Sequence, residues 1–157
     1  MTKKVMDVRA SDNKYLHRDF HASADIGLRY IGEKYGDNGV KEYLQTFARA
    51  YYKPLFTDVG ERGLVALKEQ IEKIYEIEEM PEVVHVNLTD DELDVTIDRC
   101  PAVTFFNKTG HNTSKWYVEL TRTVNETIAD QCDLGFELLA YSEETGAARY
   151  RFFKRAF

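Results

Sequence analysis

The sequence predicts an α+β fold in which helices pack on one side of a small antiparallel sheet. Three observations lead to this prediction. Apolar residues recur at three- and four-residue steps through the first half of the chain, two alternating apolar and polar segments follow as a hairpin, and one more helix and a second hairpin end the chain. Helices and strands that follow one another in such blocks are typical of α+β domains.

Length and charge limit the classes of protein to consider. The chain has 157 residues, which suits a single domain over 1–157, with residues 1–14 expected to form a loosely ordered N-terminal arm. The 21 basic and 27 acidic residues give a net charge of −6, which argues against a nucleic-acid partner. Because no apolar run approaches the roughly 20 residues of a membrane span and the start lacks a signal sequence, we expect a cytoplasmic protein without membrane partners.

Three helices are expected first. The inward stripe of the first helix begins near residue 17, contains His17 and His21, and ends at Gly36. The second carries apolar side chains on one face from Val40 to Tyr51 and should end or bend near Pro54. The third spans about 64–75 and is closed by a proline at residue 81.

Strands are expected at 84–88 and 93–97, joined by a polar turn, and at 136–141 and 148–155, joined by a second turn. Between the two hairpins we expect a loop from about 100 to 113, and then a fourth helix capped by Ser114. The basic residues near the C-terminus alternate with aromatic residues, so we interpret them as the solvent-facing side of the last strand.

The candidate catalytic residues are Cys100 and His111. Cys100 follows a predicted strand and precedes a proline, and Arg99 beside it would favour a thiolate able to attack an electrophilic carbon. His111 lies within chain reach as a general acid or base. If the strand continued, however, the thiol would lie on the outer face with Thr96, so an adjacent cleft or a β-bulge is needed. The alternatives are a packing cysteine and an exposed loop histidine.

Candidate ligand-binding residues lie mainly on the predicted fourth helix. Arg122, with Thr121 and Asn125 beside it, suits a carboxylate-bearing ligand. The alternative is an exposed ion pair between Arg122 and a glutamate three or four residues away. Tyr51 could line a pocket, although its place in the helical stripe favours core packing.

No metal or other cofactor is required by the pattern, but one divalent-metal alternative exists. His17 and His21 are four residues apart on one helical face, a spacing that can place two imidazoles on one ion if the fold supplies a third ligand. The other interpretation is that both are polar residues at the rim of the core. The chain has two cysteines, too few for a disulfide framework, and we expect Cys132 to be structural.

Five segments carry a resemblance as a set, rather than individually. They are Phe47-Ala48-Arg49-Ala50-Tyr51-Tyr52, Glu61-Arg62-Gly63-Leu64, Ile74-Tyr75-Glu76-Ile77-Glu78, Cys100-Pro101-Ala102-Val103 and Thr121-Arg122-Thr123-Val124-Asn125-Glu126. From about residue 12 to the final hairpin, the chain resembles the L-2-amino-thiazoline-4-carboxylic acid hydrolase family. The resemblance implies hydrolysis of a cyclic amidine, in which water adds to the ring carbon between nitrogen and sulfur and N-carbamoyl-L-cysteine forms.

On that resemblance, Cys100 would meet the electrophilic carbon, Arg122 or Arg99 would bind the substrate carboxylate, and His111, His17 or His21 would move the proton. A different class of function remains open, because the element order is also similar to 4-vinyl reductase-like and haem-nitric-oxide-binding-like domains, which bind a small molecule, metal or haem without catalysis. An interaction protein with an aromatic surface is the third hypothesis. A homodimer is compatible with all three.

Overall fold

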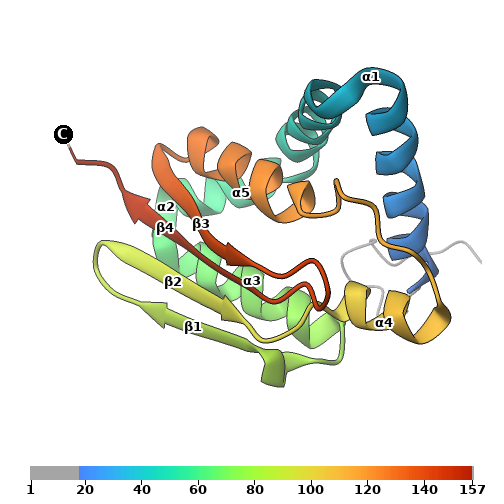
Figure 1. Ribbon diagram of the computed structural model, residues 1–157. Coiled ribbons are helices and arrows are strands. Elements are labelled where there is room, and N and C mark those ends of the chain that lie inside the picture. Colours follow the sequence, from blue (N-terminus) through green and yellow to red (C-terminus); the bar gives the residue numbers. More distant parts are fainter. Residues whose placement is uncertain (1–17, 157) are drawn as a thin grey trace, which may run out of the picture.

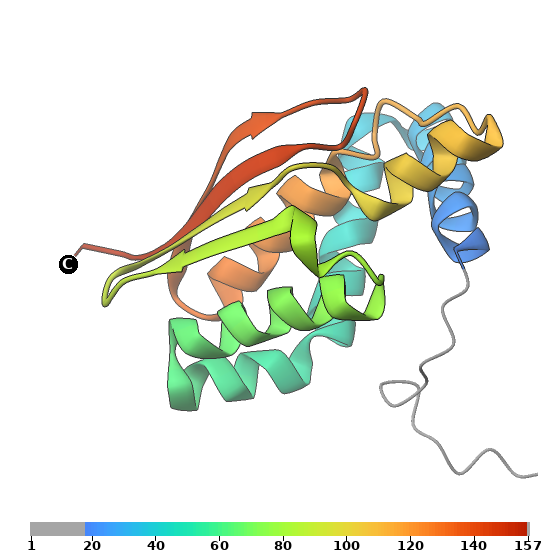
Figure 2. The same ribbon diagram turned by 90° about the horizontal axis from the view of Figure 1, so that it is seen from below.

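The computed structural model describes residues 18–156, and its α+β architecture confirms the predicted fold class (Figure 1). Four antiparallel strands form one sheet in the order β1-β2-β4-β3. The strands are β1 (Val84–Leu88), β2 (Glu92–Ile97), β3 (Leu134–Tyr141) and β4 (Ala148–Lys154), so both predicted hairpins are present. Figure 2 shows the helices gathered on one side of this sheet.

The two hairpins join through β2 and β4, where Val95 lies opposite Tyr150. Along β2 the apolar residues face the helices and are buried, as the alternating pattern predicts. On the opposite face Arg149 pairs with Asp94 at 3.1 Å, and Arg151 also pairs with acidic residues of neighbouring strands. The prediction that the C-terminal basic residues form the solvent-facing side of a strand is thus confirmed for β4.

Helix α1 (Asp19–Tyr51) bends at Gly36, which has φ 74° and ψ −171°. The expected end of the first helix is therefore a bend between two helical halves, and glycine suits it because L side chains rarely adopt a positive φ. In the second half the buried stripe runs through Val40, Leu44 and Ala48. The aromatic residues Tyr43, Phe47 and Tyr51, predicted on the same buried face, are exposed. The reason is that each lies about 100° around the helix from the more buried residue that follows it, which is Leu44, Ala48 or the half-buried Tyr52.

The prediction missed two helices. Helix α2 (Lys53–Arg62) starts directly after α1, with Pro54 in its first turn, where a missing N–H costs nothing. Helix α3 (Leu64–Ile77) follows as predicted, and the 3-10 turn η2 (Pro81–Val83) leads into β1. The expected loop after residue 100 is in fact helix α4 (Pro101–Thr109), whose apolar face packs into the core through Phe106.

Helix α5 (Glu119–Gln131) also departs from the prediction. Ser114 does not cap it, because a turn separates the two and the N-cap position makes no side-chain hydrogen bond. The backbone N–H of Ser114 instead donates to the Asp25 carboxylate of α1. Helix α5 packs against both α1 and β3, while α3 packs against β1. Within residues 18–156, no helix has the length and apolar character needed to cross a membrane.

Candidate functional site

A cavity of about 160 Å³ lies between the sheet and helices α3 and α5. Its described lining has no charged side chain, and its polar groups are those of five tyrosines, one cysteine, one threonine and one asparagine. The lining residues are Tyr52, Ile71, Ile74, Tyr75, Ile97, Cys100, Tyr117, Leu120, Thr121, Val124, Asn125, Tyr141, Gly146, Ala148 and Tyr150. Cys100, Thr121 and Asn125, predicted from sequence as site residues, thus meet in one cavity.

Cys100 reaches the cavity because β2 ends at Ile97, before the alternation could place the thiol on the outer face. The chain bends at Asp98 and Arg99, and Cys100 adopts extended backbone just ahead of Pro101. Its N–H donates to the Thr145 carbonyl at 2.9 Å, which fixes it against the β3-β4 turn. From the sequence, we expected that the thiol could reach a site only through a β-bulge or a cleft on the outer face. Neither is needed, because β2 ends before Cys100.

The electrostatic surroundings of Cys100 favour the neutral thiol. Burial raises its pKa, and the negative charge of Glu78 raises it further. The backbone N–H groups of Val103 and Ala102, in the first turn of α4, act in the opposite direction but do not outweigh burial. Arg99 does not contribute, because its guanidinium is exposed and pairs with Glu82 at 3.4 Å. The expectation that Arg99 favours a thiolate is therefore wrong for this geometry.

Two buried carboxylates each hold an imidazole at this end of the fold. Glu78, after the last turn of α3, lies 2.8 Å from His21 Nε2, which is an ion-pair distance, although the two atoms do not meet in hydrogen-bond geometry. Asp25 of α1 is completely buried and lies 2.7 Å from His111 Nε2. The charge of Glu78 acts on the Cys100 thiol, whereas His111 is engaged by Asp25 and does not line the cavity. The carboxylate whose charge acts on the thiol is therefore paired with His21 and not with His111, the histidine predicted to work with Cys100.

Glu78 and Asp25 were missed by the sequence analysis, although each leaves a signal. Asp25 follows His21 at the helical step of four and precedes the buried Leu28 by three, so a carboxylate occupies a core position of the stripe. Glu78 follows Tyr75 by three on the inward face of α3. A carboxylate in an apolar stripe must find a partner or remain unsatisfied. One oxygen of Glu78, Oε2, is buried without a hydrogen-bond partner among the described residues.

The remaining predicted ligand-binding residues lie elsewhere. Arg122 pairs with Glu119 at 2.5 Å, which is the alternative that the sequence left open. Tyr51 is 66% exposed and stacks on Phe47, so it neither lines the cavity nor packs in the core. Its neighbour Tyr52 takes the cavity position instead.

The divalent-metal alternative involves His17, which lies outside the described residues. His21 is half-buried and pairs with Glu78. Within residues 18–156, no group of three histidine, cysteine or acidic side chains is arranged to hold a metal ion. Cys132 is half-buried at the end of α5 and is a free thiol like Cys100.

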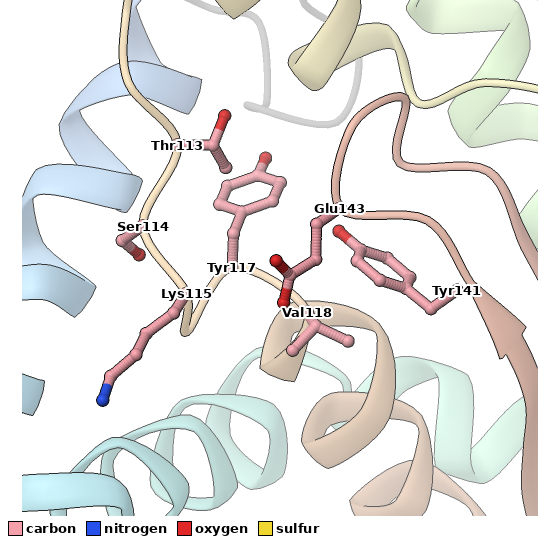
Figure 3. A pocket seen from close by; sticks show the side chains of 7 residues that line it. All are labelled: Thr113, Ser114, Lys115, Tyr117, Val118, Tyr141 and Glu143. Carbon is pink, nitrogen blue, oxygen red and sulfur yellow. The ribbon is translucent and has the colours of Figure 1, made fainter.

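A second, smaller pocket of about 140 Å³ adjoins the first (Figure 3). Tyr117 and Tyr141 line both, so their side chains form the shared wall. The second pocket differs from the cavity in having charged lining residues, Lys115 and Glu143. Figure 3 shows the Glu143 carboxylate near Tyr117 and Tyr141.

No family model, curated protein or solved structure matches the chain. The residues of the cavity themselves indicate what chemistry it can support. A thiol at a helix N-terminus, in a cavity lined by tyrosines and within the field of a buried carboxylate, can act as a nucleophile toward a small molecule once its proton is removed. The five tyrosine hydroxyls can also donate and accept hydrogen bonds, because burial raises the pKa of each and keeps the phenols neutral.

Proposed function

We propose that this protein is a small-molecule hydrolase that opens a cyclic amidine, with Cys100 as the nucleophile. The observation that carries the proposal is the place of Cys100, whose thiol lines the cavity at the first turn of α4, where the N–H groups of Val103 and Ala102 favour the thiolate against burial and against the charge of the Glu78 carboxylate. His21 on that carboxylate supplies a group that can accept and return a proton. The resemblance to the L-2-amino-thiazoline-4-carboxylic acid hydrolase family supports the same reaction class.

The reaction would proceed in two steps. The Cys100 sulfur, after giving its proton to the His21–Glu78 pair, adds to the ring carbon between nitrogen and sulfur. The bond from that carbon to the ring sulfur breaks, and the released sulfur takes a proton, so an isothiourea joins the substrate to Cys100. Water then adds to the same carbon, the bond to Cys100 breaks, and the thiol regains its proton. The net change is one water consumed and a urea group and a free thiol formed.

A carboxylate on the substrate would bind to uncharged groups in the cavity. The described lining of the cavity at Cys100 has no cationic side chain, and Arg122 is held by Glu119. Lys115 lines the adjoining pocket on the other side of Tyr117 and Tyr141. Its ammonium lies 4.6 Å from the centroid of the Trp116 ring and points away from Tyr117 and Tyr141 (Figure 3), so the groups left to bind the carboxylate are uncharged donors of the cavity lining, such as Thr121 and Asn125.

The test is turnover of L-2-amino-thiazoline-4-carboxylate by the purified protein, followed by appearance of the free product thiol. Cys100→Ala should lower kcat/KM at least about a hundredfold, because loss of a nucleophile removes the covalent route. Cys132→Ala is the matched control and should keep full activity, since Cys132 lies outside the cavity. Acid-quenched wild-type protein should carry a substrate-derived mass on Cys100. Turnover that survives Cys100→Ala would overturn the nucleophile assignment.

A non-catalytic binding module is the second candidate, and one observation favours it. Burial raises the pKa of Cys100, and every described cavity side chain is uncharged, which suits passive binding of a small molecule. The cavity is smaller than the roughly 300–1,000 Å³ of a typical ligand pocket, so such a ligand would be compact. A protein that binds the thiazoline tightly, forms no adduct and releases no thiol would support this function instead.

A further inference from the structure

The cavity at Cys100 has the features of a site for an organic cation. Five tyrosine rings contribute to its lining, from the junction of α1 and α2, from α3, from the segment before α5 and from the second hairpin. The face of an aromatic ring attracts a cation, and several rings around one cavity add their effects. Among the described lining residues there is no lysine, arginine or histidine to repel such a ligand.

A buried carboxylate beside the cavity supplies the matching negative charge. Glu78 is 9% exposed, and its Oε2 is buried with no hydrogen-bond partner among the described residues. Glu78 does not line the cavity, but its charge acts on three residues that do, Cys100, Tyr75 and Tyr117, so a positive charge in the cavity would be attracted to it. Glu78 is the C-cap residue of α3 and follows Tyr75, which lines the cavity, by three positions.

Three carboxylates add negative charge around the tyrosines of the cavity wall. Besides burial, the main cause, the charge of Glu78 raises the pKa of Tyr75 and, together with that of Asp25, the pKa of Tyr117. Burial is also the main cause that raises the pKa of Tyr141, and the charges of Glu143 and Asp25 raise it further. Arg29 lies 3.8 Å from Asp25 and offsets part of its charge, whereas the described partner of Glu78 is His21.

We propose that the cavity binds a small, flat organic cation of the amidinium or guanidinium class, held by the tyrosine rings and by the Glu78 carboxylate. The inference rests on the proposed function, which identifies this cavity as the site. It further specifies that the ligand is positively charged. It also gives the ligand a part in activating the thiol. A cation beside Cys100 counters the field of Glu78 and lowers the pKa of the thiol, so the nucleophile forms when the ligand is bound.

The test compares two ring compounds of the same shape on the Cys100→Ala variant of the full chain, where no thiol chemistry can occur. The first is 2-amino-2-thiazoline, whose amidine is protonated and cationic, and the second is thiazolidin-2-one, in which a neutral carbonyl replaces the amidine. Titration calorimetry should show the cation binding about tenfold or more tightly, as expected for cation–π contact and a buried counter-charge. Equal affinity, or tighter binding of the neutral ring, would overturn the proposal.

A second comparison assigns the charge to Glu78. Glu78→Gln in the Cys100→Ala background should reduce the preference for the cation to within about threefold, whereas Glu76→Gln, an exposed change on the same helix, should leave it intact. A preference that survives Glu78→Gln would contradict the role of this carboxylate. The affinities are measured without turnover, so the two proposals can fail separately. Binding of the cation by a protein that does not hydrolyse the thiazoline would reject the hydrolase proposal only. Hydrolysis by a protein with no preference for the cation would reject the cation-binding proposal only.

Discussion

Gly146 lies against the side chain of Cys100 so closely that a Cβ on Gly146 would be 2.3 Å from the Cys100 Cβ. Gly146 also has φ +67° in the turn between β3 and β4, and it lines the cavity. The β3-β4 turn and the start of α4 thus hold the candidate nucleophile between them, and a glycine is needed there for two separate reasons.

Gly146→Ala should therefore destabilise the protein and displace Cys100. We expect a loss of more than about 1 kcal/mol in the free energy of unfolding, because strain at positive φ adds to the steric overlap. Urea unfolding measures this loss. Gly60→Ala in α2 is the control, since an added Cβ there meets nothing within 4 Å, and this variant should be slightly more stable. A Gly146→Ala protein as stable as the wild type would contradict the observed contact.

The buried tyrosines should make the protein sensitive to alkaline pH. Burial raises the pKa of Tyr52 to about 12 and raises the pKa of Tyr150 as well. The unfolded chain releases these protons near pH 10 and the folded chain does so only at higher pH, so the free energy of unfolding should fall as pH rises above about 10. Each such hydroxyl contributes up to about 1.4 kcal/mol per pH unit. Urea unfolding across this range, with phenolate absorbance recorded in parallel, checks the sign; constant stability would contradict it.

Alkylation should report the environment of the Cys100 thiol. In a Cys132→Ala background, we expect iodoacetamide to modify the folded protein more slowly than the urea-unfolded chain at about pH 8, because burial and the charge of Glu78 both raise the pKa of Cys100. Glu78→Gln removes one of these causes and should shift the pH profile of alkylation to lower pH. A shift to higher pH would show that Glu78 does not act on the thiol in this way.

Asp25 should be essential for stability, because it is completely buried and bonded to His111 and to the Ser114 N–H. Asp25→Ala leaves both groups without their acceptor, and we expect a loss of about 3 kcal/mol or more in the free energy of unfolding. Asp58→Ala, which removes an exposed partner of Arg62, is the control and should change the melting temperature little. Similar melting temperatures for the two variants would show that the Asp25 contacts contribute nothing.

The only tryptophan of the chain reports on a close contact in α1. A Cβ on Gly32 would lie 2.4 Å from Cε2 of Trp116, whose indole N–H donates to Asp37 at 2.7 Å. Gly32→Ala should push the indole outward and shift its fluorescence emission to longer wavelength. Gly27→Ala, with nothing within 4 Å of the added Cβ, should leave the emission unchanged. An unchanged spectrum in Gly32→Ala would contradict the contact.

The fold class and both hairpins could be predicted because alternation and helical steps are properties of neighbouring residues. A break at Gly36 was predicted as well, although as the end of a helix and not as a bend within α1. Helix α4 was not, because a proline after Cys100 looks like the start of a loop until its apolar face is seen to pack on the core. For the site, Cys100, Thr121 and Asn125 could be identified by residue type. Their association with Tyr52, Tyr75 and Glu78 depends on packing between distant segments, which local patterns do not encode.

The junction of the two hairpins has a kinetic consequence. Asp94 and Arg149 contact each other across 55 residues of chain, so β2 and β4 can join only after a large loop has closed. Contacts of such sequence separation tend to form late. Since Ile97 of β2 and Ala148 of β4 both line the cavity, the cavity is complete only after β2 has paired with β4. A bound ligand should accordingly slow unfolding while leaving the folding rate nearly unchanged.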